Sequence, residues 1–375
     1  MNKARRFRNK LLKRIARTRA LPPSPARDAQ LEAERRRFMM SGGCKAVILR
    51  GLKRLKGKTD QQIFRLADRI DLSTSCDRPV RWRYKEKKSG GVRQICNPPI
   101  TVRLGQLIAR DLLIAQVTPD RCLYDWPGRG IHRHVADIRT ALETVGLYAF
   151  TLDIRDCYEH VDIDNVYGLK LLPPELIRSS IDPRYLRFRQ SHQVSESNLP
   201  YVVAHHNSTD PRGLLQGGSA SSAIVVALLG NVSASFPSSV WGGGIADDFI
   251  VVGQDHDMVD DARGKLARYL TECPLGPSEF HWASVDVRVG FQHVGCLFMS
   301  IDEIVETLIP EGKLDALIER MTAVIRNPPP EESGRAVDHH VRKALGPYPW
   351  AVDWQREHVA ECAAEACVLN SVFPG

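Results

Sequence analysis

The chain has 375 residues, of which 43% are hydrophobic, and a formal net charge of +8. This length is enough for about two or three domains. It contains no apolar run of about 18 residues, as a membrane-spanning helix would need, and its basic N-terminus lacks the apolar stretch of a signal peptide. The nine cysteines form no Cys-x-x-Cys pair, so a cytoplasmic protein with reduced thiols is the simplest interpretation.

The first 27 residues contain ten Lys or Arg residues and no acidic residue. Because like charges repel, we expect a tail that is extended, or helical only against a partner. Polyphosphate is the partner that such a segment suits, and the side chains expected to bind structured RNA are Arg5, Arg6, Arg8, Lys10, Lys13, Arg14 and Arg17. A solvated basic tail is the alternative, whereas the lack of a clean apolar face argues against a membrane surface.

Hydrophobic periodicity predicts the following elements in chain order. Helices are expected over residues 28–55, 60–70 and 102–117, and a β-hairpin with a Gly-Gly turn over residues 80–95. A strand is expected over residues 149–154, a glycine-rich loop followed by an apolar helix over 214–231, and two strands around a tight turn over 240–252. An amphipathic helix over 257–270, strands over 285–298 and a mostly helical region from residue 312 complete the chain.

Three of these segments carry groups suited to chemistry. Asp153 ends an apolar strand, and Asp247 and Asp248 stand side by side between two apolar strands. Adjacent carboxylates repel each other unless a cation lies between them, and Mg²⁺ prefers such oxygen ligands. The glycine-rich loop over residues 213–222 could bring backbone N–H groups close to a ligand. Each segment alone could be an ordinary turn or helix cap, but the three together favour a metal-dependent site.

These segments resemble the palm motifs of reverse transcriptases, especially the bacterial enzymes of retrons, group II introns and phage-defence systems. The resemblance rests on TLDIRDCY (151–158), GLLQGGSASS (213–222) and IADD (245–248). It extends to KKSGGVRQICNP (87–98) as a fingers segment, GRGIHRH (128–134) as a glycine-rich segment and FQHVGCLF (291–298) as a primer-grip hairpin. Together these motifs span about residues 80–300, more than half of the chain.

The sequence departs from the family pattern at three places. Ile245 stands where an aromatic residue is usual, and Ser222 stands where proline is usual. The segment GPSEFHWAS (276–284) lacks the family's Asn-x-x-Lys-Thr, so the lysine that donates a proton is missing and His281 is the best substitute as general acid. His132 and His134 are interpreted as structural or template-contacting residues.

The resemblance implies an α+β right-hand polymerase with fingers, a palm of antiparallel sheet plus helices, and a small helical thumb. The domains would be a basic N-terminal tail (1–27), fingers and N-terminal helices with part of the palm (28–148), a catalytic palm (149–300) and a helical thumb or C-terminal region (301–375). The activity would be RNA-directed DNA synthesis from dNTPs by two-metal phosphoryl transfer, with Mg²⁺ as the cofactor and Mn²⁺ as an alternative. Its setting would be phage defence or a retroelement.

The resemblance also assigns roles to individual residues. Asp153, Asp247 and Asp248 would be catalytic, and the metal ligands would be Asp153, Ile154, Asp247 and Asp248. The nucleotide would contact Lys87, Lys88, Arg93, Tyr158, Gln216 and Gly217, with Tyr158 excluding a 2′-hydroxyl. His293, Val294 and Gly295 would form the primer grip.

Several alternatives remain open at this point. They are untemplated or protein-primed DNA synthesis, RNA-directed RNA synthesis, and a non-catalytic RNA-binding protein on a polymerase scaffold. The expected partners are an RNA template, which could be a dedicated non-coding RNA, a DNA product or primer, and dNTPs, with no membrane. A protein partner or an oligomer is also open.

Overall fold

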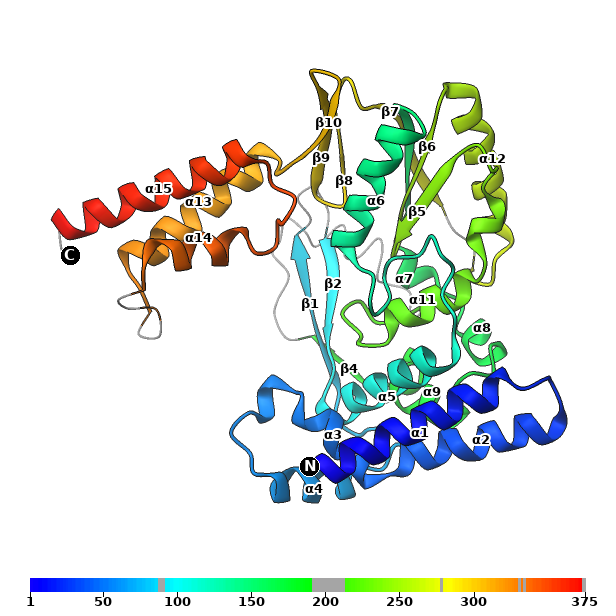
Figure 1. Cartoon of the computed structure of the whole chain (residues 1–375). Helices are drawn as coiled ribbons and strands as arrows, with labels where there is room; N and C mark the ends of the chain where they lie inside the picture. Colours follow the sequence, from blue (N-terminus) through cyan, green and yellow to red (C-terminus); the bar gives the residue numbers. More distant parts are fainter. Residues whose placement is uncertain (87–91, 191–212, 277–278, 330–331, 333–334, 373–375) are drawn as a thin grey trace. The chain divides into compact units, whose positions relative to one another are not determined.

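The computed structural model describes residues 1–86, 92–190, 213–276, 279–329, 332 and 335–372. These residues form a mixed α+β structure, the class that the family resemblance implies, and their strands make three sheets (Figure 1). The chain divides into two compact units. Unit 1 comprises Met1–Asp120, Ile154–Val232 and Arg268–Glu279, and unit 2 comprises Arg121–Asp153, Ser233–Ala267 and Phe280–Gly375. The predicted domain limits at residues 27, 148 and 300 stay predictions.

The basic N-terminal segment of unit 1 is helical, one of the two forms expected for it, and it packs against other helices of the same unit. Asn2–Ala20 form helix α1, and its residues Leu11, Ile15 and Thr18 are buried. These residues recur at helical spacing and make a narrow buried stripe, apolar at Leu11 and Ile15 and polar at Thr18. The stripe packs within the unit against α2 (Pro25–Met40), α3 (Gly42–Arg50) and α5 (Ile100–Gln116). Burial of Leu11 and of Ile15 contributes roughly 2 kcal/mol each, which favours a packed helix over an extended segment.

Two of the basic side chains of α1 bind acidic partners inside unit 1. Arg8 donates two hydrogen bonds to Asp111, at 3.1 and 2.5 Å, and Arg14 donates one to Glu34 at 2.5 Å. Both carboxylates are buried, so each needs a cationic partner to be stable there. These pairs join α1 to α5 and α2, and they explain why this basic segment is an integral helix.

The other helices of unit 1 begin where the sequence provides caps. The Ser24 hydroxyl accepts a hydrogen bond from the Arg27 N–H at the start of α2, and Thr59 and Gln62 form a capping box at the start of α4 (Asp60–Arg69). The predicted helices over 28–55, 60–70 and 102–117 are thereby confirmed as α2 with α3, α4, and α5. A short 3₁₀ helix occupies Lys53–Leu55.

The strand pairing of the hairpin predicted over residues 80–95 is confirmed in a three-stranded sheet of order β2-β1-β4, whereas its Gly-Gly turn lies outside the described residues. Strands β1 (Val80–Glu86) and β2 (Val92–Asn97) are antiparallel, and β4 (Phe188–Gln190) pairs in parallel with β1. The remaining helices of unit 1 are short: α7 (Cys157–His160), α8 (Ile163–Gly168), α9 (Pro174–Ser180), the 3₁₀ helix Pro183–Tyr185, α11 (Ser221–Leu229) and the 3₁₀ helix Val232–Ser235 at its boundary. The predicted loop and helix over 214–231 are confirmed by α11.

Unit 2 is built on two antiparallel arrangements of strands. One sheet has the order β5-β6-β3-β7, from β5 (Trp241–Ile245), β6 (Asp248–Gly253), β3 (Tyr148–Ile154) and β7 (Phe280–Asp286). The other has the order β10-β9-β8, from β8 (Phe291–His293), β9 (Cys296–Ile301) and β10 (Ile304–Leu308). Helix α6 (Ile131–Thr144) contacts β5, β6 and β10, and α12 (His256–Glu272) follows β6 along the chain. The strands predicted over 149–154, 240–252 and 285–298 are therefore confirmed.

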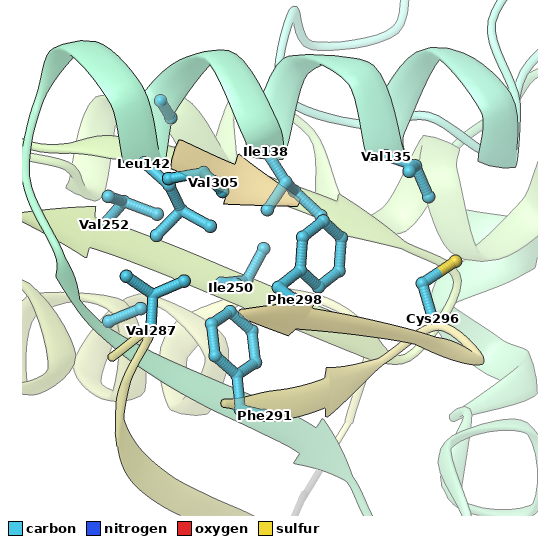
Figure 2. Close-up of a cluster of buried hydrophobic side chains, with 12 residues drawn as sticks. Val135, Ile138, Leu142, Ile250, Val252, Val287, Phe291, Cys296, Phe298 and Val305 are labelled. Atoms are coloured by element: carbon cyan, nitrogen blue, oxygen red, sulfur yellow. The ribbon is translucent and has the colours of Figure 1, made fainter. Parts of the chain in front are cut away.

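A buried apolar cluster joins α6 to both sheets of unit 2 (Figure 2). Helix α6 contributes Val135, Ile138 and Leu142 to this cluster, and β6 contributes Ile250 and Val252. The second sheet contributes Phe291, Cys296, Phe298 and Val305, with the two phenyl rings 5.4 Å apart and stacked. This cluster fixes the face of β3 and β6 that points toward α6.

The C-terminal part of unit 2 is helical, as predicted. Helices α13 (Glu311–Arg326), α14 (Val337–Leu345) and α15 (Asp353–Val372) pack around a second apolar core. The buried Gln355 side chain accepts a hydrogen bond from the Ile309 N–H and donates one to the Ile309 carbonyl, which ties α15 to the segment after β10. All nine cysteines are free thiols, and no described helix is long and apolar enough to cross a membrane.

Candidate metal centre

The sheet of unit 2 places two carboxylates directly opposite each other. In the antiparallel pairing of β3 with β6, Asp153 is the register partner of Asp248. Residues paired in this way point to the same face, with Cβ atoms about 4.5–5.5 Å apart. Asp153 comes one residue before the end of β3 and Asp248 begins β6, so both lie at one edge of the sheet.

The third carboxylate comes from the turn between β5 and β6. Ala246 and Asp247 are the two residues of this turn, and Ala246 has a left-handed φ of 56°. Asp153, Asp247 and Asp248 each offer a carboxylate oxygen within 4.8 Å of the other two. We call these three residues the carboxylate cluster.

The sequence around the turn explains why β5 can approach its neighbours closely. A Cβ atom on Gly244 would lie 2.5 Å from the Phe249 ring, and one on Gly243 would lie 2.7 Å from the Trp241 ring. A side chain at Gly244 would therefore displace β5 from β6, and one at Gly243 would clash with Trp241 of the same strand and with His134 on α6. In β6, the residues from Phe249 to Val252 are fully buried, so the hairpin is held firmly behind the carboxylates.

Strand alternation shows which face carries the cluster. Ile250 and Val252 belong to the apolar cluster of Figure 2, and Asp248 shares their face because side chains alternate along a strand. Thr151 and Asp153 share the face of Ala149 on β3 for the same reason. The carboxylates thus continue the apolar face at the point where the core ends.

A pocket of about 310 Å³ adjoins the carboxylate cluster within unit 2. Its lining consists of residues 151–153, Asp248, residues 281–283 and residues 292–295. His281 is exposed on β7 and points to the same face as Val285, which packs on the apolar cluster. None of the described lining residues is Lys or Arg and two of them are carboxylates, so the pocket itself offers a triphosphate no Lys or Arg side chain.

The arrangement of the three carboxylates fits divalent cations. Mg²⁺ binds oxygen at about 2.0–2.1 Å, so two ligands opposite each other on one ion are about 4.2 Å apart. The 4.8 Å limit on the cluster is compatible with one shared ion or with two ions bridged by a carboxylate. The hydrocarbon side chain of Ile154 has no ligand atom and is buried, so this residue could contribute only its backbone carbonyl.

The predicted primer-grip residues form the turn between β8 and β9. His293 and Cys296 are the closing pair, and the two turn residues have positive φ, 43° for Val294 and 83° for Gly295. His293 is buried, and its Nε2 lies 3.3 Å from the Nε2 of His134 on α6. Burial lowers the pKa of His293 to about 4; burial, with a smaller contribution from His293, lowers that of His134 to about 3.

Three residues predicted to contact the nucleotide meet in unit 1. The Gln216 amide donates a hydrogen bond to Glu159 at 3.2 Å, and its backbone carbonyl accepts one from Cys96 at 2.9 Å. Gly217 has φ 87°, which favours glycine. Tyr158 is partly buried in α7, and its carbonyl accepts a hydrogen bond from Leu214 at 2.5 Å. The glycine-rich loop therefore packs on β2 and α7.

The remaining predicted residues are placed as follows. Arg93 lies on β2 opposite Lys85, while Lys87 and Lys88 lie outside the described residues. On α1, Arg5, Arg6, Lys10, Lys13 and Arg17 are exposed, as is Arg14 despite its bond to Glu34, and Arg8 is partly buried against Asp111. None of these positions tests the roles predicted for the side chains.

Sequence reasoning did not identify some residues of the pocket and its walls. Thr151 and Gln292 line the pocket, and alternation along β3 could have indicated Thr151 from its spacing to Asp153. The contact of His134 with His293 joins residues 159 positions apart, and no local sequence pattern predicts it.

Comparison with solved structures finds distant likenesses to two telomerases. A telomerase from Candida albicans in complex with a TWJ fragment of telomeric RNA matches at 13% identity over 79% of this chain, with a TM-score of 0.40. An apo telomerase from Candida tropicalis, truncated from its C-terminal domain, matches at 14% identity over 62% of this chain, with a TM-score of 0.36. This chain spans 61% and 56% of those structures, respectively. Similarity this low identifies neither a family nor an activity.

No model of a known protein family matches the chain, and no curated protein matches its sequence.

Proposed function

We propose that this chain is a reverse transcriptase, which extends a DNA strand on an RNA template by adding dNTPs. The observation that carries this proposal is the carboxylate cluster, in which two strands and a two-residue turn bring three carboxylates within 4.8 Å. Strands β5 and β6, which contain buried residues, flank the turn and hold these charges at a solvent-accessible end of the sheet. Like charges held so close together are costly unless a cation is bound.

The donor set suits magnesium, with Asp153 and Asp247 as the principal ligands and Asp248 as a weaker ligand or a nearby charge. The Ile154 carbonyl would complete the set. When bound, Mg²⁺ ions would activate the primer hydroxyl and neutralise charge on the transferred and departing phosphates. The role of the protein in such a reaction is mostly to position the reactants and stabilise charge.

Different residues of this chain would bind the two substrates, the primer end and the incoming nucleotide. The pocket beside the cluster, which lacks cationic lining residues, would hold the sugar and base of the primer end. Gln216, Gly217 and Tyr158 would contact the incoming nucleotide, with Tyr158 excluding a 2′-hydroxyl. Arg93, with Lys87 or Lys88, would bind the triphosphate, and His281 would act as general acid.

The larger organisation follows from the same proposal. Unit 2 would supply the catalytic part of the palm, and α13–α15 would form a small thumb that tracks a duplex. The exposed basic residues of α1 would bind RNA through its phosphates, a contact that weakens as salt rises. A cytoplasmic enzyme of a retron, a group II intron-like element or a phage-defence system is the setting we propose.

The test is nucleotide incorporation by the purified protein with its bound RNA left in place. Each labelled dNTP and NTP is supplied with Mg²⁺ or Mn²⁺, beside the isosteric variant Asp247→Asn as a control. We expect deoxynucleotide incorporation that disappears in the variant and after RNase treatment. Incorporation that resists RNase would indicate untemplated or protein-primed synthesis, and a preference for NTPs would indicate an RNA polymerase. RNA binding without any incorporation would contradict the proposal and favour a non-catalytic scaffold.

A further inference from the structure

The turn between β8 and β9 forms one wall of the pocket beside the carboxylate cluster. Two consecutive positive φ values match the tight hairpin turn in which Asn-Gly or Gly-Gly is preferred. Here the first position is Val294, at φ 43°, where a β-branched side chain is rarely found. Residues held in such conformations persist only where the surrounding structure fixes them, and they concentrate at functional sites.

A buried histidine pair holds the start of this turn. The side chains of His134 and His293 are 0% and 5% exposed, and their Nε2 atoms are 3.3 Å apart. A hydrogen bond between these atoms requires that one ring donates and the other accepts. Since His134 lies on α6, the contact anchors the turn to the helix that covers the sheet.

The surroundings of His134 fix its ring in one orientation. The ring centroids of Tyr124 and Trp241 lie 4.5 and 6.2 Å away, and a Cβ atom on Gly243 would lie 3.0 Å from His134 Cε1. The Tyr124 hydroxyl donates to Asp137 at 2.6 Å, and His134 Nδ1 has no hydrogen-bond partner among the described residues. The contact with His293 is therefore the polar anchor of this imidazole.

The end of the turn has a separate anchor. Lys313 on α13 donates a hydrogen bond from Nζ to the Gly295 carbonyl at 2.9 Å. The left-handed backbone is thus fixed on both sides, by His293 before the turn and by Gly295 within it. Such fixation matters for a reaction in which small displacements of the reacting groups cost large factors in rate.

We infer that His134 is a positioning residue: through His293 it holds the 293–295 turn against the pocket and so sets where the primer end lies. This inference rests on the proposed function. His134 need not touch either substrate, because its effect passes through the backbone of the turn. The incoming nucleotide, which the proposal assigns to other residues, depends little on this contact.

The kinetic test compares His134→Leu with His134→Gln, whose amide can take the place of the imidazole Nε2. For His134→Leu we expect a kcat that falls about 10–100-fold and a higher KM for the primer–template, with the KM for dNTP changed less than about twofold. His134→Gln should recover most of the loss. Glu143→Gln, an exposed change on the same helix, is the matched control. Wild-type kinetics in His134→Leu would overturn the inference.

A second measurement reads the turn without turnover. Hydrogen exchange of the peptide covering residues 291–298 should be faster in His134→Leu than in the wild type, and unchanged in Glu143→Gln. If the wild-type protein incorporates no nucleotide, the proposed function fails while this exchange measurement still decides whether His134 fixes the turn. Unchanged exchange in a folded His134→Leu protein would contradict the inference whatever the activity.

Discussion

Two hairpin turns of unit 2 share a backbone feature and differ in chemistry. The β5–β6 turn has Ala246 at φ 56°, and the β8–β9 turn has Val294 at φ 43°, although neither residue favours the left-handed region. The first turn presents charge, through Asp247 and the neighbouring Asp248. The second presents none, and it is held by a neutral histidine pair and a lysine. The first turn thus carries charged side chains, whereas the His134–His293 contact and the Lys313 ammonium hold the backbone of the second.

The largest expected effect comes from removing charge at the first turn. Asp153→Asn and Asp247→Asn keep the side-chain volume and remove a metal ligand, so Mn²⁺ affinity measured by calorimetry should fall at least about 100-fold. Asp248→Asn should have a smaller effect if this residue is the weaker ligand. Each variant should unfold at or above the wild-type temperature, because like-charge repulsion is relieved. Wild-type Mn²⁺ affinity in Asp247→Asn would show that the cluster is not the metal site.

The next effect concerns the second turn, through the pH dependence of stability. Because the folded pKa values of His134 and His293 lie below the ordinary value of about 6.5, the unfolded chain takes up protons first as pH falls. The free energy of unfolding should therefore decrease from pH 7 toward pH 4, by on the order of 2 kcal/mol for His293 at pH 5. Nearby titratable groups are Tyr124, which bonds to Asp137, and Lys313 at Gly295.

This pH dependence can be separated from that of other groups by comparison. Urea unfolding of the wild type and His134→Gln should diverge at pH 7 and converge toward pH 5, because the variant lacks one buried imidazole. Parallel pH profiles for the two proteins would contradict the account of the pair.

Features that depend on neighbouring residues in the sequence could be predicted, whereas features that depend on contacts between distant residues could not. The strand that contains Asp153 and the hairpin that carries Asp247 and Asp248 were predicted, because a short apolar run and a tight turn are local signals. The closeness of these carboxylates required the register of β3 with β6, which follows from no local pattern. It was suggested only by the family resemblance.

Features that depend on distant partners were missed. The N-terminal segment was expected to be extended, or helical only against a partner, but its partners within the chain were not foreseen: ion pairs of Arg8 with Asp111 and of Arg14 with Glu34 anchor α1. A charge run indicates repulsion within itself and gives no information about buried acids elsewhere in the chain. The His134–His293 contact was unpredictable for the same reason.

The smallest expected effect is a change in thermal stability when the residue with positive φ in either turn is replaced by glycine. Ala246→Gly should stabilise the protein by about 0.5 kcal/mol, since glycine accepts φ 56° and the relief exceeds its greater entropy when unfolded. Val294→Gly gains similar relief but loses a side chain that packs against the apolar cluster, so it should not stabilise. Thermal unfolding of both variants checks this difference. A more stable Val294→Gly protein would show that strain outweighs packing at the second turn.

If the carboxylate cluster catalyses nucleotide addition, as we propose, the rate of single-nucleotide primer extension depends on it. Wild type and Asp247→Asn are compared on an RNA template with Mg²⁺ and one dNTP, with Ala246→Gly as the control in the same turn. We predict a loss of at least about 1000-fold in Asp247→Asn, and a rate in Ala246→Gly within about tenfold of the wild type. Equal extension by the wild type and a folded Asp247→Asn protein would contradict this proposal.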